Sequence, residues 1–222
     1  MGTGNKQLFF YALEVVFQSL LGVYVDDTVL AARSLRDMKG IKRSLSDGFV
    51  MQDLGELHYF LGIQIAQNPI DRTSWVGQSV LVQRLLETFG MNNCKNTSTS
   101  VNSGTKLTKT NDSDERVDCR LYQSLIGRLL YLSIATRPDI SFAVSSLAKY
   151  CSNLSVQHWI AAKHLLPYLK GTVTVGLLFS NDKSHQPLIT GNSDADWAGD
   201  VWSRFLCGWQ PLVTFSSWMV PQ

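Results

Sequence analysis

The sequence predicts an α+β fold, and three observations lead to that prediction. Short runs rich in β-branched and aromatic residues, at 20–32 and 57–65, alternate with apolar residues that repeat every three or four positions. Three further helical patterns follow one another between 121 and 169. Strand-like runs come last, at 175–179 and 188–194. This order of mixed elements, then helices, then strands indicates an α+β chain in two or three units.

The composition is that of an ordinary globular protein. The 222 residues are 45% hydrophobic and 17% charged, with a net charge of +2. The sequence contains no run of 18 apolar residues, the length needed to span a bilayer. Its N-terminus lacks the pattern of a secretory signal. The four cysteines have neither zinc-finger nor redox spacing, which favours free thiols in a reducing compartment. We therefore expect an intracellular protein, in the cytoplasm or nucleus, that is neither secreted nor inserted in a membrane.

The first elements are two strands and a helix. Residues 20–32 read LLGVYVDDTVLAA, two β-rich apolar runs that flank Asp26 and Asp27, which predicts a hairpin with the acids at its turn. An amphipathic helix should follow, capped by Ser34. Its inward residues recur every three or four positions: Leu35, Met38, Ile41, Leu45 and Phe49.

The next segment should pair two strands and then start a second helix. LHYFLGIQI at 57–65 reads as one strand, and a turn near Pro69 leads to a short strand at 74–77. We expect Ser79 to cap the helix and Gly90 to end it.

Residues 92–117 are dominated by Asn, Thr, Ser, Lys and Asp, which predicts a polar linker or a long surface loop. The first helix after it is marked by Leu121 to Leu132, and the second should start at Thr136-Arg137-Pro138-Asp139. The third runs from about His158 to Leu169, where Pro167 should kink or terminate it.

The adjacent carboxylates at the hairpin tip are the main candidate for chemistry. Two neighbouring anions between apolar strands repel each other, and a divalent cation such as magnesium would relieve that repulsion. A solvated Asp-Asp turn is the alternative, because turns favour aspartate. Just after the pair, five cations fall within eleven residues, and a solvated helix face is the better interpretation of them: Arg33, Arg36, Lys39, Lys42 and Arg43.

Six motifs in order carry a resemblance to a known family. Tyr24-Val25-Asp26-Asp27 resembles the active-site hairpin of reverse transcriptases. The resemblance to the Pol polyprotein of copia-type LTR retrotransposons continues through five further segments: MQDLGELHYFLGIQI (51–65), QRLLETFGM (83–91), LYQSLIGRLLYLSIATRPDISFAV (121–144), HWIAAKHLLPYLKGT (158–172) and SDADWAGD (193–200).

The resemblance implies four regions. Residues 1–91 would be a partial palm with the YVDD hairpin and a primer-grip region, followed by the polar linker at 92–117. Residues 118–185 would be a helical thumb, and residues 186–222 the truncated, strand-forming start of an RNase H domain.

Roles for single residues follow from the same resemblance. Asp26 and Asp27 would hold Mg²⁺. Because neighbouring side chains on a strand point to opposite faces, we expect one of the two to be the primary ligand, and the family pattern favours Asp26. Tyr24 would pack beneath the primer end. The primer backbone would lie on Phe60, Leu61 and Gly62, with Gly62 allowing close approach. Asp194 would match the first metal-binding carboxylate of RNase H.

The resemblance implies three kinds of partner: an RNA or DNA template–primer duplex, deoxynucleoside triphosphates and the remainder of a Pol polyprotein. The thumb helices would follow the minor groove of the duplex.

The family takes a third palm carboxylate from a strand upstream of the hairpin, yet Glu14 is the only acid before Asp26. VWSRFLCGWQP at 201–211 also departs from the family pattern. We therefore expect a polymerase fragment that is inactive alone. One alternative is a non-catalytic nucleic-acid-binding module that uses the thumb and the basic helix after the hairpin. The other is a structural or interaction protein with no nucleic-acid role.

Overall fold

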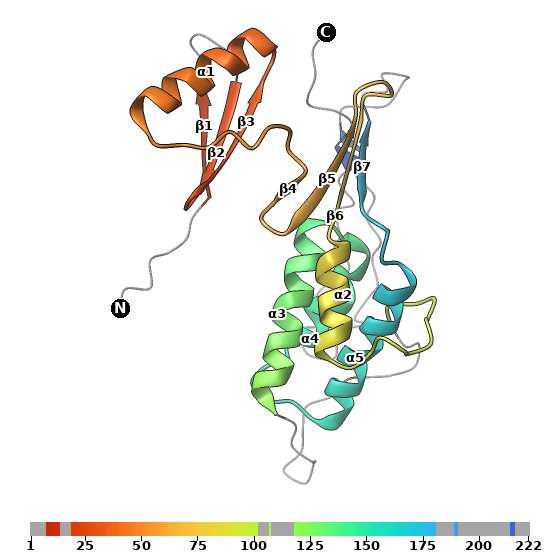
Figure 1. The fold of residues 1–222 in the computed structure, drawn as a ribbon. Coiled ribbons are helices and arrows are strands. Elements are labelled where there is room, and N and C mark those ends of the chain that lie inside the picture. Colours follow the sequence, from red (N-terminus) through yellow and green to blue (C-terminus); the bar gives the residue numbers. More distant parts are fainter. Residues whose placement is uncertain are drawn as a thin grey trace, which may run out of the picture. The chain divides into compact units, whose positions relative to one another are not determined.

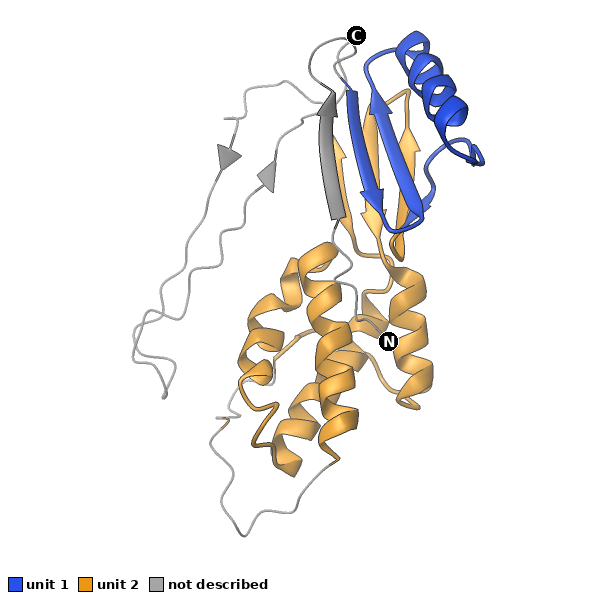
Figure 2. Cartoon of the chain, turned by 90° about the vertical axis from the view of Figure 1, so that its left-hand side faces the viewer, with its two compact units in different colours: residues 1–60, 218–222 blue, residues 61–217 orange. Residues whose placement is uncertain are grey.

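A computed structural model describes residues 8–13, 19–101, 107, 118–180, 189–190 and 214–215. The chain forms two compact units (Figure 2). The first comprises residues 1–60 and 218–222, and the second comprises residues 61–217. Mixed α+β structure, with antiparallel sheets and helices, confirms the predicted fold class.

The first unit is a three-stranded antiparallel sheet with one helix (Figure 1). The strands β1 (Leu8–Leu13), β2 (Ser19–Tyr24) and β3 (Asp27–Ala32) lie in that order. Leu21 pairs with Leu30 and Tyr24 with Asp27, which confirms the predicted hairpin.

The helix α1 (Leu35–Gly48) contacts β3 and is present as predicted. Two of the five residues expected to face inward were wrong: Leu35 is 79% exposed, and Phe49, the C-cap after the last turn, is 68% exposed. Ser34 is its N-cap, and the Ser34 hydroxyl accepts a hydrogen bond of 3.1 Å from the backbone N–H of Asp37. Ile41, 5% exposed, is the buried residue of this helix. The unit ends in the two-residue strand β4 (Tyr59–Phe60).

The second unit contains an antiparallel hairpin joined by a later strand. β5 (Ile63–Asn68) pairs with β6 (Thr73–Gly77), and β6 pairs with β7 (Leu177–Ser180). The prediction of one strand over 57–65 was wrong. The chain turns at Leu61 and Gly62, whose φ angles of 52° and 78° lie in the left-handed region that a strand cannot contain.

Below the sheet, α2 (Ser79–Thr88), α3 (Cys119–Ala135), α4 (Ser141–Ala148) and α5 (Val156–Gly171) pack together (Figure 1). A short 3₁₀ turn, η1 (Pro138–Ile140), links α3 to α4, with proline at its first position as expected. The helices bury one apolar core whose fully buried members come from α2, α3, α4 and α5, including Leu85, Leu129, Val144 and Leu165.

Two local predictions on these helices were wrong. Gln78, and not Ser79, is the N-cap of α2, and the Ser79 hydroxyl instead donates to the side-chain oxygen of Gln64 at 2.5 Å. Of the two effects expected of Pro167, a kink or an end to the helix, the end is wrong, because α5 continues to Gly171. The last turn stays helical because Leu166 and Leu169 are fully buried there, which offsets the hydrogen bond that proline cannot donate.

In its described part, residues 92–101 and 107, the predicted linker forms no helix or strand. Its backbone nevertheless contacts α5, because the N–H of Thr97 donates to the carbonyl of Pro167 and Lys170 donates to the carbonyl of Cys94. Two short strands, β8 (Ile189–Thr190) and β9 (Thr214–Phe215), pair with each other. Among the residues the structure describes, no helix is long and apolar enough to cross a membrane.

Candidate functional site

The acidic hairpin has a two-residue loop, Val25 and Asp26, closed by the pair Tyr24 and Asp27. Val25 has a φ of 54° and is 53% exposed. A β-branched residue at positive φ is strained by roughly 1–3 kcal/mol, and such strain is concentrated at functional sites. The expectation that Asp26 and Asp27 alternate along one strand does not apply, because Asp26 lies in the loop and only Asp27 belongs to β3. Both carboxylates are exposed.

The donor chemistry of this loop fits magnesium in part. Aspartate oxygens are the hard ligands that Mg²⁺ takes, and the ion keeps several waters. No group of three or more His, Cys, Asp or Glu side chains converges anywhere in the described part of the chain. Asp26 and Asp27 could therefore supply two oxygen ligands to one ion, with the remaining positions filled by water.

The turn at Leu61 and Gly62 is held by the helical region of its own unit. The hydroxyl of Tyr131, on α3, donates a hydrogen bond to the backbone carbonyl of Leu61. Gly62 has a φ of 78°, a conformation that glycine adopts without the steric cost other residues meet. The glycine is thus explained by the turn itself, and the turn is fixed to α3. Phe60, the third residue of the predicted primer grip, ends β4 in the first unit.

One side of α3 is exposed along its whole length. Residues spaced three or four positions apart lie on it: Arg120, Gln123, Gly127, Tyr131 and Ile134. A Cβ at Gly127 would meet nothing within 4 Å. Glycine inside a helix is less stable than alanine by about 1 kcal/mol, so the fold gives no reason for this residue.

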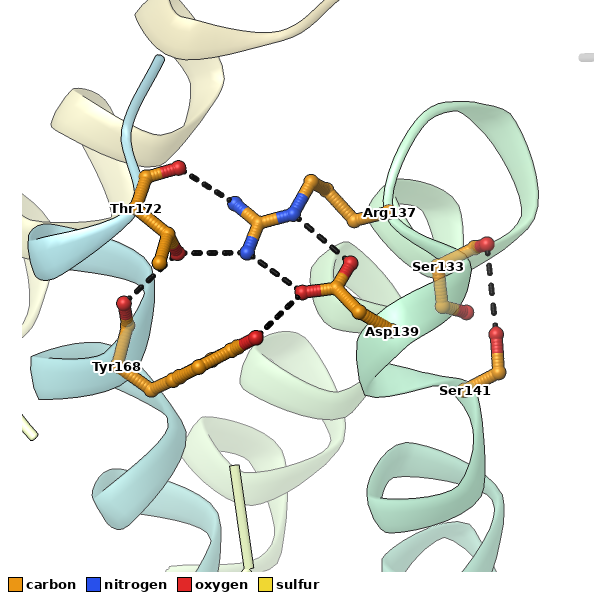
Figure 3. A network of polar contacts seen from close by, with 6 residues as sticks. All are labelled: Ser133, Arg137, Asp139, Ser141, Tyr168 and Thr172. Atoms are coloured by element: carbon orange, nitrogen blue, oxygen red, sulfur yellow. Dashed lines mark hydrogen bonds and ion pairs between the residues drawn. The ribbon is translucent and has the colours of Figure 1, made fainter. Parts of the chain in front are cut away.

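A polar network joins the end of α3 to the end of α5 (Figure 3). The guanidinium of Arg137 is 2% exposed and donates two hydrogen bonds, of 2.9 and 2.8 Å, to the carboxylate of Asp139. It also donates to the carbonyl and the hydroxyl of Thr172, at 2.9 and 2.6 Å. The Tyr168 hydroxyl completes the network by donating to Asp139 at 2.9 Å.

The electrostatics of this network follow from its contacts. Burial raises the pKa of Asp139, but the hydrogen bonds and positive charge of Arg137 outweigh burial, so the pKa lies below its usual value. Burial, followed by the bond to Asp139, raises the pKa of Tyr168. The network thus keeps one charged pair at the point where the two helices meet, and its role is to fix their ends.

Sequence reasoning named Arg137 and Asp139 only as a helix start and missed Tyr131 altogether. The run Arg-Pro-Asp could have indicated a charged pair, because proline fixes the turn that brings the two charges together. Thr172 and Tyr168 could not have been assigned from spacing. Asp194 lies outside the described residues.

Comparison with known proteins places these features in a family. The profile described as "Reverse transcriptase (RNA-dependent DNA polymerase)" matches residues 10–103. The chain is 34% identical over 190 residues to the "Retrovirus-related Pol polyprotein from transposon TNT 1-94" of Nicotiana tabacum, and 34% identical over 186 residues to that from transposon RE1 of Arabidopsis thaliana.

These alignments cover 83% and 80% of this chain but only 14% and 12% of the two polyproteins. An uncharacterized mitochondrial protein of Arabidopsis thaliana is also 34% identical, over 82% of this chain and 73% of its own length. No solved structure matches the chain.

Proposed function

The chain belongs to the reverse transcriptase family of copia-type retrotransposon Pol polyproteins, and from that premise we propose that it carries part of the palm and the thumb of a magnesium-dependent RNA-directed DNA polymerase. The single observation that carries the proposal is the hairpin loop, where Asp26 and Asp27 lie exposed beside a strained Val25. Backbone strain is concentrated at functional sites, and exposed carboxylates are the ligands with which a metal-dependent phosphoryl-transfer site can hold its ions.

In this proposal the carboxylates of Asp26 and Asp27 hold the metal, with Asp26 as the primary ligand. Bound magnesium would neutralise charge on the phosphates and align the attacking and leaving oxygens. Tyr24, which is half-buried and pairs with Asp27, supports the primer end. The turn at Leu61 and Gly62 holds the primer backbone, with the Tyr131 bond fixing its position.

The thumb contribution rests on the exposed side of α3. Contacts between such a helix and the minor groove of a duplex go mainly to phosphate and sugar, which needs close approach more than base-specific side chains. Gly127, with open space around it, provides that approach. A Gly127→Leu variant should therefore weaken duplex binding without destabilising the helix.

We also propose that the 222-residue polypeptide does not extend a primer alone. Two adjacent carboxylates supply an incomplete ligand set for two-metal catalysis, and positioning with charge neutralisation provides nearly all the rate in this chemistry. RNase H chemistry at Asp194 is incomplete for the same reason in this proposal, since the sequence after 200 departs from the family pattern.

Primer extension tests both statements. The purified chain with primer–template, Mg²⁺ and nucleotides should give no product above background. Fused behind the upstream palm segment of a copia-type relative, it should extend the primer. Asp26→Asn should abolish that extension, and Asp47→Asn, at an exposed acid on α1, should leave it unchanged. Extension by the chain alone would overturn the inactivity, and extension by the fused Asp26→Asn variant would overturn the role of the hairpin.

The alternative of a non-catalytic nucleic-acid-binding module is favoured by one observation, the open surface around Gly127. It predicts duplex binding that weakens steeply between low and moderate salt, with no change in Asp26→Asn. Absence of binding at low salt would exclude it.

A further inference from the structure

The helix α1 carries a row of cations on the side away from its sheet. Arg36, Lys39 and Arg43 are spaced by three and four residues, so they lie along one side of the helix, and all three are exposed. Ile41 is the buried residue of α1 and marks the other side. Within the described residues none of the three takes part in an ion pair, whereas their neighbour Lys42 is bound to Asp53 at 2.8 Å.

The stability of the helix does not explain this row. A cation in the first turn of a helix faces the positive end of the macrodipole, and Arg36 stands there. No cation stands in the last turn, where it would be favourable, and Asp47 occupies that turn instead. Arg36 and Asp47 oppose the helix dipole, each at a cost of some tenths of a kcal/mol, whereas Asp37 in the first turn is favourable.

A glycine interrupts α1 beside the row. Gly40 is exposed in the middle of the helix, and a Cβ there would meet nothing within 4 Å. Neither a turn, nor a positive φ, nor a close internal contact requires glycine at this position. The residue leaves a shallow surface between the cations, which allows a backbone-sized partner to approach.

The dimensions of the row fit a polyanion with regular spacing. From Arg36 to Arg43 the helix rises about 10 Å at about 1.5 Å per residue. One strand of a nucleic acid duplex carries one phosphate for about every 3.4 Å of its axis, so about three phosphates fall within this length, as many as there are cations in the row. Unpaired cations at this spacing are complementary in charge to such a strand.

From these observations we infer that Arg36, Lys39 and Arg43, with Gly40 between them, form a second nucleic-acid contact that binds a phosphate backbone. The row follows the end of β3 opposite the Tyr24–Asp27 loop. It therefore requires neither the carboxylates nor magnesium, and the contact is independent of the proposed polymerase site.

The test compares two variants with the same change in charge. Arg36→Gln/Lys39→Gln/Arg43→Gln removes the row. Arg72→Gln/Arg84→Gln/Lys95→Gln removes three exposed cations elsewhere. Binding of the 222-residue protein to a 30-base-pair DNA duplex is measured by fluorescence anisotropy between 50 and 200 mM salt. Each phosphate contact contributes about 0.9 to the slope of log K against log salt.

Loss of the row should lower the slope by about 2 to 3 and weaken binding at least tenfold at 50 mM salt. The control variant should change both much less. Gly40→Gln should weaken binding with no change in slope, because it adds bulk and no charge. Equal losses in the two triple variants would overturn the inference, since net charge alone would then explain them.

Two further arms separate other outcomes. Vesicles of phosphatidylserine and phosphatidylcholine offer the same phosphate chemistry on a membrane. If removal of the row abolished vesicle binding and left duplex binding intact, the partner would be a membrane and the inference would fail. Asp26→Asn/Asp27→Asn should keep full binding, so failure of the polymerase proposal leaves this contact testable by itself. Circular dichroism of each variant checks that the helices are retained.

Discussion

Replacing Arg137 by methionine should destabilise the second unit by about 3 kcal/mol. The guanidinium makes four hydrogen bonds, two to Asp139 and two to Thr172, and its side chain is 2% exposed. Removing one partner of a buried ion pair costs about 3–5 kcal/mol, because the other charge is left without compensation. Asp139 keeps 32% of its side chain in solvent and still accepts from Tyr168, which places the expected loss at the lower end.

The assay is urea unfolding followed by circular dichroism, whose helical signal comes mostly from the second unit, because it contains α2, α3, α4 and α5. Arg137→Met, Asp139→Asn and the double variant form a cycle whose coupling should exceed about 1 kcal/mol, because the two side chains bond directly. Lys42→Met breaks an ion pair that is open to solvent, and it should leave the transition unchanged. If Arg137→Met behaved like Lys42→Met, the network would not hold the ends of α3 and α5 together.

Three other predictions follow from single contacts. The pKa of Asp139 is lowered on folding, so the carboxylate stabilises the fold above its unfolded pKa of about 4, and this contribution is lost as pH falls through the folded pKa. In Asp139→Asn the free energy of unfolding should therefore depend less on pH in this range. Gly77→Ala should lower the free energy of unfolding in urea by about 1–3 kcal/mol, because the new Cβ would overlap the ring of Trp75. Gly127→Ala, with nothing within 4 Å of the new Cβ, should raise it by about 0.5–1 kcal/mol. Equal effects of the two variants would contradict this packing. Tyr131→Phe should cost about 0.5–1.5 kcal/mol by removing the bond to the Leu61 carbonyl, measured in the same way, and no change would show that the bond adds nothing.

The parts of the fold that sequence could predict are those set by neighbours in the chain. Ser34 capped α1 as expected, because a cap needs only the N–H three residues later. The hairpin at residues 20–32 was predictable for the same reason, since a two-residue loop between apolar runs determines its own register.

What could not be predicted depends on contacts far apart in sequence. The aromatic and β-branched run at 57–65 gave no sign of its break, because the turn at Leu61 is held by Tyr131, seventy residues later. Pro167 remains inside α5 because neighbouring helices bury the turn around it. The site was predictable only at the hairpin loop, where the acids are adjacent in sequence.

The two units should differ sharply in stability, because nearly all the buried apolar surface of the described residues belongs to the second. Its helices share one core in which Leu85, Leu129 and Leu165 are fully buried, whereas Ile41 is the one buried hydrophobic residue described in the first. Local opening free energies follow buried contacts. Backbone amides of α3 and α5 should therefore exchange hydrogen slowly, and those of α1 rapidly, in the isolated chain. Fusion to an upstream palm segment should slow exchange in α1 and leave α3 unchanged, since only the first unit gains surface to pack against. Slow exchange of α1 in the isolated chain, equal to that of α3, would show that the hairpin unit is already complete in itself.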